Sequence, residues 1–392
     1  MTSTVVSEWP ERARALATTL TAAGVLTDPR WRAAIEDIPR HLFVPRFYRT
    51  DDTLVDATNP ANLAEWLDTV YSDTSLIVQC VKAPGTDLYI PTSSSTMPSL
   101  MIRMLHLLHV TDGCSVMEIG TATGYNAALL CHRLGSEHIA SIELHPDLAA
   151  AAAECLHHLG YKPTPAVGDG ADGIPHRAPY DRIIATCAVT AIPPAWIDQL
   201  TPGGRILTDL RGELASSLAV LDKIAPDTVQ GRLLDQPGHF MWLRSTPQDP
   251  LPTTGHYGLM INRDEAETID TDLDPRLLTE PGLRVLLSIA EPHLGPITHT
   301  PREGHDSWWL RAGDCWAEIT TGNTTTVTYG GPRNLWATIE RVTAEWQRSG
   351  RPGRGRYGLT ATADGTHHYW LDHPDQLLST TTASQRQLTT AN

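Results

Sequence analysis

The sequence predicts an α/β fold: a Rossmann-like domain preceded by N-terminal helices and followed by a smaller C-terminal α+β domain. Short β-like runs alternate with helical stretches between residues 115 and 221, a pattern typical of βαβ units and a parallel sheet. After Gly231 the sequence becomes rich in Pro, Thr and Trp, and seven of the eleven tryptophans lie there. The predicted divisions are a helical, substrate-covering region (1–110), a Rossmann-like core (111–230) and a C-terminal extension (231–392).

The N-terminal region is expected to begin with two helices. Apolar residues recur at helical spacing between Glu8 and Ala23, and Asp28-Pro29 has the residue types of a helix cap and first turn. The stretch from Ile38 to Pro45 contains prolines near both ends, so it cannot continue a helix and is expected to form a loop or turn. Further elements expected before residue 110 are a short apolar run at residues 76–78 and a helix over residues 99–109.

The alternating region supplies the elements of a parallel sheet. Strands are expected at residues 115–119, 138–144, 182–185 and 205–209, with helices over residues 126–134 and 146–159. In the extension, strands are expected at residues 315–320 and 324–329, and a helix over residues 333–347. The final polar stretch, residues 380–392, is expected to be frayed.

Composition argues against several classes of protein. A formal net charge of −15 disfavours binding to nucleic-acid phosphates, so no nucleic-acid partner is expected. No run approaches the roughly 18 apolar residues of a membrane span, and Met1–Pro10 lacks a basic stretch leading into an apolar segment. A cytoplasmic protein without a membrane partner is therefore expected. The sequence does not indicate its oligomeric state. The six cysteines are scattered, which predicts neither a metal site nor a disulfide framework.

A glycine-containing loop follows the first strand of the alternating region. Residues 118–125 read Glu-Ile-Gly-Thr-Ala-Thr-Gly-Tyr and open a helix, so Gly120 and Gly124 lie where the backbone turns tightly and lets a ligand approach. Glu143 ends the next strand, where a carboxylate can accept hydrogen bonds from both hydroxyls of a ribose. The loop and the acid together predict a nucleoside-containing cofactor. The alternative is a plain turn and a surface acid.

Downstream elements distinguish a methyltransferase from a nicotinamide enzyme. Asp169, within Gly168-Asp169-Gly170, follows a third strand and is expected beside an adenine, where it can accept from the exocyclic amine. Residues 178–185 supply the fourth strand with its lead-in, and residues 200–206 supply a helix end and a glycine turn into the fifth. This succession is the pattern of class I methyltransferases, so the predicted cofactor is S-adenosylmethionine and the product S-adenosylhomocysteine. The predicted cofactor-binding residues are Glu118, Gly120, Thr121, Ala122, Gly124, Tyr125, Asn126, Glu143, Leu144, Gly168, Asp169 and Gly170.

A set of longer motifs runs through residues 10–221. They are Pro39-Arg40-His41, Phe43-Val44-Pro45, Tyr71-Ser72-Asp73, the glycine loop, Gly168-Asp169-Gly170, Pro179-Tyr180-Asp181 and Leu200-Thr201-Pro202-Gly203-Gly204. With these motifs the chain resembles the protein-L-isoaspartate O-methyltransferase family, which implies a polypeptide carboxylate as methyl acceptor. Two positions depart from the family pattern. Ala122 stands where the family has a middle glycine, and residues 93–96 replace a Thr-Ile-Ser-x-Pro segment near the reacting carboxylate.

The serine run at residues 93–96 and the C-terminal extension also resemble a subgroup of this family that acts on ribosomally made, modified peptides, especially graspetides and lanthipeptides. In that subgroup an aspartate of a cyclised precursor peptide is methylated and then collapses to an aspartimide (succinimide). The resemblance implies such a modified precursor peptide as substrate, with the extension as its binding domain. Two alternatives stay open: a repair methyltransferase acting on isoaspartate in damaged proteins, and a non-catalytic cofactor-binding peptide adaptor, which Ala122 leaves possible.

Methyl transfer to an aspartate carboxylate needs no general base, because a carboxyl with a pKa of about 3.9 is already ionised at neutral pH. The predicted catalytic residues are Ser93, Ser94, Ser95 and Thr96, and hydroxyls from Ser94 to Thr96 are expected to hold the carboxylate in place. The alternatives for this run are a solvated linker or an N-cap for the helix near Ser99. His41 and Asp73 are expected either to line the pocket or to be structural.

Overall fold

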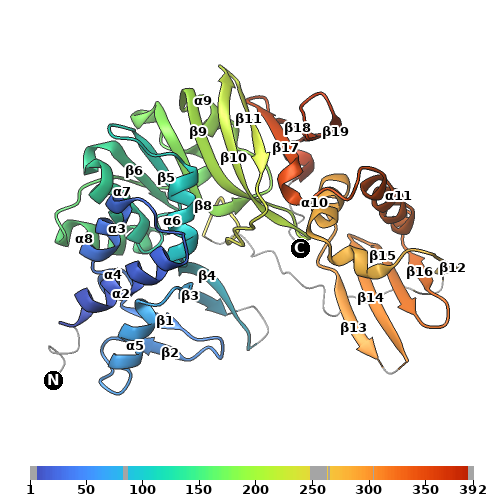
Figure 1. The fold of residues 1–392 in the computed structure, drawn as a ribbon, viewed down its shortest axis with the longest axis horizontal. Helices are drawn as coiled ribbons and strands as arrows, with labels where there is room; N and C mark the ends of the chain where they lie inside the picture. Colours follow the sequence, from blue (N-terminus) through green and yellow to red (C-terminus); the bar gives the residue numbers. More distant parts are fainter. Residues whose placement is uncertain (1–6, 83–86, 248–262, 264, 303, 387–392) are drawn as a thin grey trace. The chain divides into compact units, whose positions relative to one another are not determined.

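The structure is a computed structural model that describes residues 7–82, 87–247, 263, 265–302 and 304–386. The chain forms two compact units, and it crosses between them several times (Figure 1). Unit 1 comprises Met1–Cys187, Ala195–Thr208 and Phe240–Asp249. Unit 2 comprises Ala188–Pro194, Asp209–His239 and Pro250–Asn392. Neither unit is therefore one continuous stretch of sequence.

Unit 1 begins with the two expected helices. They are α2 (Trp9–Ala22) and α3 (Pro29–Asp37), and the Asp28 side chain accepts from the Arg30 backbone N–H at 2.8 Å, which confirms the expected cap. The stretch from Ile38 to Pro45, expected to be a loop or turn, contains one helical turn, α4 (Arg40–Phe43), and does not continue α3. Pro39 immediately precedes this turn, where a helix does not need its N–H, so the proline bounds the turn without breaking it.

A four-stranded antiparallel sheet follows in unit 1. Its strands are β1 (Arg46–Tyr48), β2 (Leu54–Asp56), β3 (Leu76–Lys82) and β4 (Tyr89–Ser95), in the order β2-β1-β3-β4, with α5 (Leu63–Val70) between β2 and β3 in sequence. The apolar run at residues 76–78 is thus the start of a longer strand. The serine run is not a solvated linker, because residues 93–95 pair with β3.

The Rossmann-like core of unit 1 has the predicted alternation of strands and helices. Its elements are α6 (Pro98–Leu107), β5 (Val116–Ile119), α7 (Tyr125–Leu134), β6 (Ile139–Glu143), α8 (Pro146–His158), β7 (Thr164–Val167), β8 (Tyr180–Val189), α9 (Pro194–Asp198) and β9 (Leu200–Arg211). β5 pairs in parallel with β6 on one side and β8 on the other, in the order β9-β8-β5-β6-β7. Figure 1 shows α7 and α8 beside β5 and β6. The turn expected at Gly203-Gly204 is wrong, because both glycines lie within β9.

Unit 2 contains five antiparallel strands drawn from distant parts of the chain. They are β10 (Ser216–Ala225), β11 (Thr228–Leu233), β17 (Tyr357–Thr362), β18 (Thr366–Leu371) and β19 (Leu377–Thr382), in the order β10-β11-β17-β18-β19. The frayed end expected from residue 380 is wrong for the described part, because residues 380–382 pair with β18 and Thr381 is buried. Residues 387–392 of that expectation lie outside the described residues.

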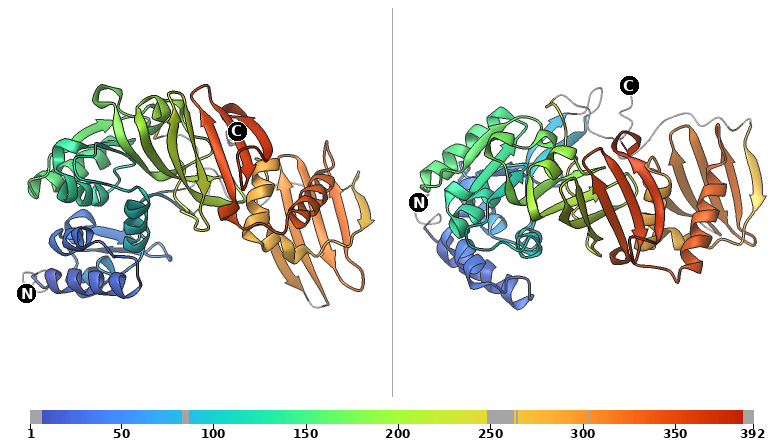
Figure 2. Two further views of the ribbon diagram at one scale, coloured as in Figure 1. Left: turned by 45° about the horizontal axis from the view of Figure 1, so that its top comes forward. Right: turned by 90° about the horizontal axis from the view of Figure 1, so that it is seen from above.

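A second antiparallel sheet of unit 2 lies in sequence between β11 and β17. Its strands are β12 (Glu267–Asp270), β13 (Thr298–Arg302), β14 (His305–Ala312), β15 (Cys315–Thr321) and β16 (Thr326–Gly330), in the order β12-β16-β15-β14-β13. The helices of this region are α10 (Pro281–Ala290) and α11 (Leu335–Arg348), and α11 packs against β15 and β16 (Figure 2). β15, β16 and α11 confirm the expected strands and helix. Trp308, Trp336 and Trp346 are buried, so these aromatics fill a core.

Two features are absent from the described residues. None of the described helices combines the length and apolar character that crossing a bilayer requires. Within the same residues, no group of three or more His, Cys, Asp or Glu side chains is arranged to hold a metal ion.

Candidate active site

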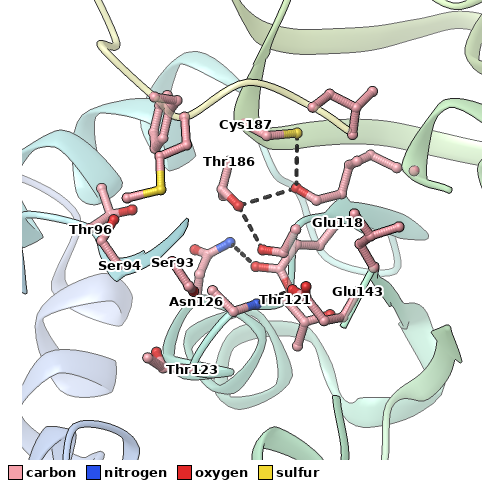
Figure 3. Close-up of a pocket in the computed structure, with 18 of the residues that line it drawn as sticks. Ser93, Ser94, Thr96, Glu118, Thr121, Thr123, Asn126, Glu143, Thr186 and Cys187 are labelled. Atoms are coloured by element: carbon pink, nitrogen blue, oxygen red, sulfur yellow. Dashed lines mark hydrogen bonds between the residues drawn. The ribbon is translucent and has the colours of Figure 1, made fainter. Parts of the chain in front are cut away.

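One pocket in unit 1 collects most of the predicted site residues. It lies where β5, β6 and β8 end, and the end of β4 and residues 240–244 complete its walls. The carboxyl edge of a parallel sheet, at a strand with neighbours on both sides, is the usual place for a ligand in α/β folds. The pocket is open to solvent, and it encloses about 900 Å³ of space when its mouth is included. Figure 3 shows Ser93, Ser94 and Thr96 on one side of this pocket and Glu143 on the other.

All but three of the residues predicted from the sequence line this pocket. Gly124 instead begins α7 in a left-handed conformation, where an added Cβ would lie 3.0 Å from the Cβ of Ala152. Gly168 and Asp169 lie outside the lining, and the Asp169 carboxylate accepts from the Ala171 backbone N–H at 2.8 Å. The predicted residues that do line it are Ser93, Ser94, Ser95, Thr96, Glu118, Gly120, Thr121, Ala122, Tyr125, Asn126, Glu143, Leu144 and Gly170.

Several lining residues were missed by sequence reasoning. Thr186 and Cys187 lie near the end of β8, so the rule that ligands meet the carboxyl ends of parallel strands was a usable signal for them. Residues 240–244 carry no local signal, because they reach the pocket only after the chain has passed through β10 and β11 of unit 2. The remaining missed residues are Thr92, Met101, Ile119, Thr123 and Ile142.

Glu143 is held in position by two backbone N–H groups. Its Oε2 accepts from Ala122 at 2.8 Å, and its Oε1 accepts from His145 at 3.1 Å. The side chain is nearly buried at the pocket wall. A carboxylate oxygen has two lone pairs, so each oxygen can still accept a hydrogen bond from a ligand. The acid at the end of β6 is therefore preorganised as an acceptor.

Glu118 lines the pocket, but its carboxylate is hydrogen-bonded to neighbouring side chains of the protein. The side chain is fully buried, and it accepts from Asn126 Nδ2 at 2.7 Å and from Ser141 Oγ at 2.5 Å. The pKa of Glu118 is raised to about 7, chiefly by burial and to a smaller extent by nearby Glu143, against the lowering effect of these two hydrogen bonds. Thr121 Oγ1 lies 2.5 Å from Ser141 Oγ, so the network ties the loop to β6.

The glycine loop uses left-handed backbone at Gly120, Ala122 and Gly124, and one of these three residues is not a glycine. Gly120 has a φ of 91°, and an added Cβ would lie 2.8 Å from Thr186 Oγ1, so only glycine fits. Ala122 has a φ of 47°, the left-handed region where a Cβ costs about 1 kcal/mol. The backbone of Ala122 is therefore strained, as that of a glycine at the same position would not be.

The residues of the serine run, 93–96, alternate in burial at the end of β4. Ser93 and Ser95 are buried, whereas Ser94 and Thr96 are half-buried. The Ser95 hydroxyl accepts from Arg40 Nη2 at 3.4 Å. Ser94 and Thr96 are thus the more exposed members of the run, and all four residues line the pocket.

Residues near the pocket have structural roles that settle two open alternatives. The α6 N-terminus is capped by Asp73 Oδ1, which accepts from the Ser99 backbone N–H at 2.8 Å, so the serine run does not cap it. His41 Nδ1 lies 2.9 Å from Tyr71 Oη, and burial lowers the pKa of His41 to about 4. Neither His41 nor Asp73 lines the pocket. Within the described part of the chain, His41 therefore packs with Tyr71 and Asp73 caps α6, and both roles are structural.

Arg40 ties the serine run to the N-terminal part of unit 1. It is fully buried, and its guanidinium donates to the carbonyls of Val70 at 2.7 Å, Ser72 at 3.1 Å and Thr96 at 3.2 Å. Burial lowers the pKa of Arg40, and the ring of Tyr125 lies 5.5 Å from its guanidinium carbon. The carboxyl end of β4 is therefore fixed by hydrogen bonds rather than free to move.

A parallel sheet with a glycine loop after β5 and an acid ending β6 is the arrangement of nucleoside-binding α/β folds, a group that includes the class I methyltransferases. The family model described as protein-L-isoaspartate(D-aspartate) O-methyltransferase (PCMT) matches residues 11–237. The chain belongs to this family.

Individual relatives agree with the family match. Protein-L-isoaspartate O-methyltransferase 2 of Archaeoglobus fulgidus is 34% identical over 192 residues, covering 48% of this chain and 74% of that protein. The protein-L-isoaspartate O-methyltransferase of Hyperthermus butylicus is 30% identical over 265 residues, covering 64% of this chain and 92% of that protein. A solved structure named protein-L-isoaspartate O-methyltransferase shares the fold, with a TM-score of 0.54 at 21% identity, and covers 92% of this chain and 100% of that chain.

Family membership confirms three predictions made from the sequence. The fold is that of a class I methyltransferase, the enzyme class is S-adenosylmethionine-dependent protein carboxyl O-methyltransferase, and the cofactor of the family is S-adenosylmethionine. The relatives act on protein or peptide substrates, which confirms a polypeptide partner. Their names favour isoaspartate as the acceptor over the cyclised precursor peptide predicted first.

Proposed function

We propose that the protein transfers a methyl group to the carboxylate of an L-isoaspartyl residue in a polypeptide. One observation carries this proposal: the hydroxyl-bearing end of β4 opens into the same pocket as the glycine loop and Glu143 (Figure 3). A carboxylate site and a nucleoside site therefore share one cavity. The relatives named for isoaspartate supply the substrate class.

The pocket's own groups fit S-adenosylmethionine. Glu143 has an acceptor position left on each carboxylate oxygen, which suits the two hydroxyls of a ribose. Asn126 Oδ1 is buried without a hydrogen-bond partner among the described residues, so it can accept from a donor on the ligand. When bound there, S-adenosylmethionine supplies an electrophilic methyl group. Gly120 and Ala122 let the ligand lie against the loop backbone.

Ser94 and Thr96 are proposed to position the substrate carboxylate. Their hydroxyls can donate to carboxylate oxygens, and a strand places alternate side chains on one side. The carboxylate is already ionised at neutral pH, so these residues need only hold it and exclude water. Ser95, bonded to Arg40, is proposed to fix the strand end. After esterification the next backbone nitrogen can close a five-membered imide with loss of methanol.

A second candidate is methylation of an aspartate in a cyclised precursor peptide. It is favoured by the strand of hydroxyl residues at 92–96, which stands where the family has Thr-Ile-Ser-x-Pro. The extension does not favour it, because a solved structure named for isoaspartate shares the fold over 92% of this chain. In both cases residues 1–110 are proposed to cover the substrate and residues 231–392 to bind part of the polypeptide.

Intact-mass analysis of three peptides separates these functions. Peptides of one sequence would carry L-isoaspartate, linear L-aspartate, or L-aspartate within a ring, each incubated with enzyme and S-adenosylmethionine. Gain of one methyl group on the isoaspartyl peptide alone is the expected result. Methylation of the ring peptide alone would replace the proposal with the second candidate. Cofactor binding without methylation of any peptide would leave only the non-catalytic adaptor.

A further inference from the structure

Residues 240–244 line the cofactor pocket although they lie beyond the family-matched residues 11–237. They belong to unit 1 together with the glycine loop and Glu143. The residues just before them, Asp209–His239, belong to unit 2. Because residues 240–244 return to unit 1 after a stretch in unit 2, contacts within unit 1 are needed to hold them at the pocket.

Arg244 supplies such a contact at the Glu143 end of the pocket. Its Nη2 lies 2.9 Å from His145 Nε2, and its Nη1 donates to the Pro247 carbonyl at 3.3 Å. A guanidinium only donates, so His145 Nε2 is the unprotonated, accepting nitrogen. The His145 backbone N–H in turn donates to Glu143 Oε1. Arg244 is thus linked through one residue to the carboxylate assigned to the ribose.

We propose that the Arg244–His145 hydrogen bond is a latch that holds residues 240–244 over the bound cofactor and slows its dissociation. The inference rests on the proposed function, because it takes this pocket as the cofactor site. Arg244 and His145 are positioning residues, since they act on the ligand through residues 240–244. A ligand behind a wall that closes its pocket leaves when that wall opens, so breaking the latch speeds release.

The latch depends on pH, because it needs a neutral imidazole. Burial lowers the pKa of His145 and the Arg244 guanidinium lowers it further, while the carboxylates of Glu143 and Asp147 oppose both effects. A histidine whose pKa lies below its usual value of about 6.5 stays neutral above that pH and gains a proton only at lower pH. The latch is therefore closed at neutral pH and opens as the pH falls through the lowered pKa.

The test is the rate at which S-adenosylhomocysteine dissociates from the full chain, measured by stopped-flow displacement between pH 5 and pH 8. Arg244→Met removes the donor and is expected to speed release roughly fivefold at pH 7.5, the effect of one net hydrogen bond. His145→Gln retains an acceptor that does not titrate, so its release should stay slow at every pH. Arg177→Met, which removes an exposed arginine that donates to the Glu137 carbonyl, is the matched control and should behave as wild type.

The outcomes separate the latch from the proposed function. Faster hydrogen exchange of residues 240–244 in unliganded Arg244→Met would accompany the faster release. If Arg244→Met binds the ligand and releases it at the wild-type rate, the latch is overturned and the proposed function stands. Faster release at low pH in His145→Gln would also overturn the latch. Failure of the wild-type chain to bind S-adenosylhomocysteine would overturn both.

Discussion

Replacing Glu118 with glutamine should stabilise unit 1 at alkaline pH. Burial raises the pKa of this carboxyl from its usual value of 4.5 to about 7 in the folded chain. The protonated form therefore contributes stability fully below about pH 4.5, and that contribution is lost as the pH rises through 7. Because one pH unit corresponds to about 1.4 kcal/mol, the wild type should lose about 2.5 kcal/mol relative to Glu118→Gln between pH 5 and pH 8.

The substitution preserves the local hydrogen bonds. The amide oxygen of the introduced glutamine can accept from Asn126, and its amide nitrogen can donate to Ser141 Oγ, whose own proton can then turn to Thr121 Oγ1. Any constant effect of the change cancels when the two pH values are compared. Hydrogen exchange of β5 and α7 peptides in urea reports the free energy of unfolding of unit 1 alone, which matters because a two-unit chain need not unfold in one step.

Glu11→Gln on the exposed face of α2 removes the same charge from the surface and serves as the control. Its free-energy difference from wild type should be the same at both pH values. A Glu118→Gln difference that is also constant between pH 5 and pH 8 would refute the reasoning, since it would mean that the buried carboxyl titrates as it does in the unfolded chain.

Three further predictions concern the pocket. Ala122→Gly should relieve about 1 kcal/mol of left-handed strain and raise the free energy of unfolding of unit 1 by at most that amount, measured by hydrogen exchange in urea; a lower free energy of unfolding would contradict the strain. Glu143→Gln should weaken the same binding roughly tenfold or more, because a charged acceptor becomes neutral; unchanged affinity would remove the ribose assignment. Ser94→Ala and Thr96→Val should lower kcat/KM for an isoaspartyl peptide about tenfold while cofactor affinity stays constant, and a loss of cofactor affinity would contradict them.

The parts of the site that could be predicted are those fixed by local geometry. Gly120 is required because the backbone is left-handed and a side chain would meet Thr186 Oγ1. Glu143 is found at the end of β6 because a parallel strand and its following helix set that position. Both signals lie within one βαβ unit, so a single stretch of sequence contains them.

The parts that could not be predicted depend on long-range pairing. Serine has low β propensity, yet residues 93–95 form a strand because β3 pairs with them. An N-cap for α6 was one alternative for that run. The cap comes instead from Asp73, whose carboxylate accepts a hydrogen bond from the backbone N–H of Ser99, 26 residues later. Residues 240–244 reach the pocket after crossing another unit. No pattern within a short window records any of these contacts.

The pairing of β11 with β17 has a consequence for how this chain can change in length. Arg232 and Gly358 are register partners, so the long stretch between them is in effect a hairpin connection that carries its own sheet. The entropy lost on closing a loop grows only with the logarithm of its length, by about 0.6 kcal/mol per doubling. The part of this connection that carries β12 to β16 can therefore be lengthened, shortened or exchanged while β11 and β17 keep their register, whereas residues 240–244 within it line the pocket of unit 1. Diversity among related chains would be expected to concentrate there.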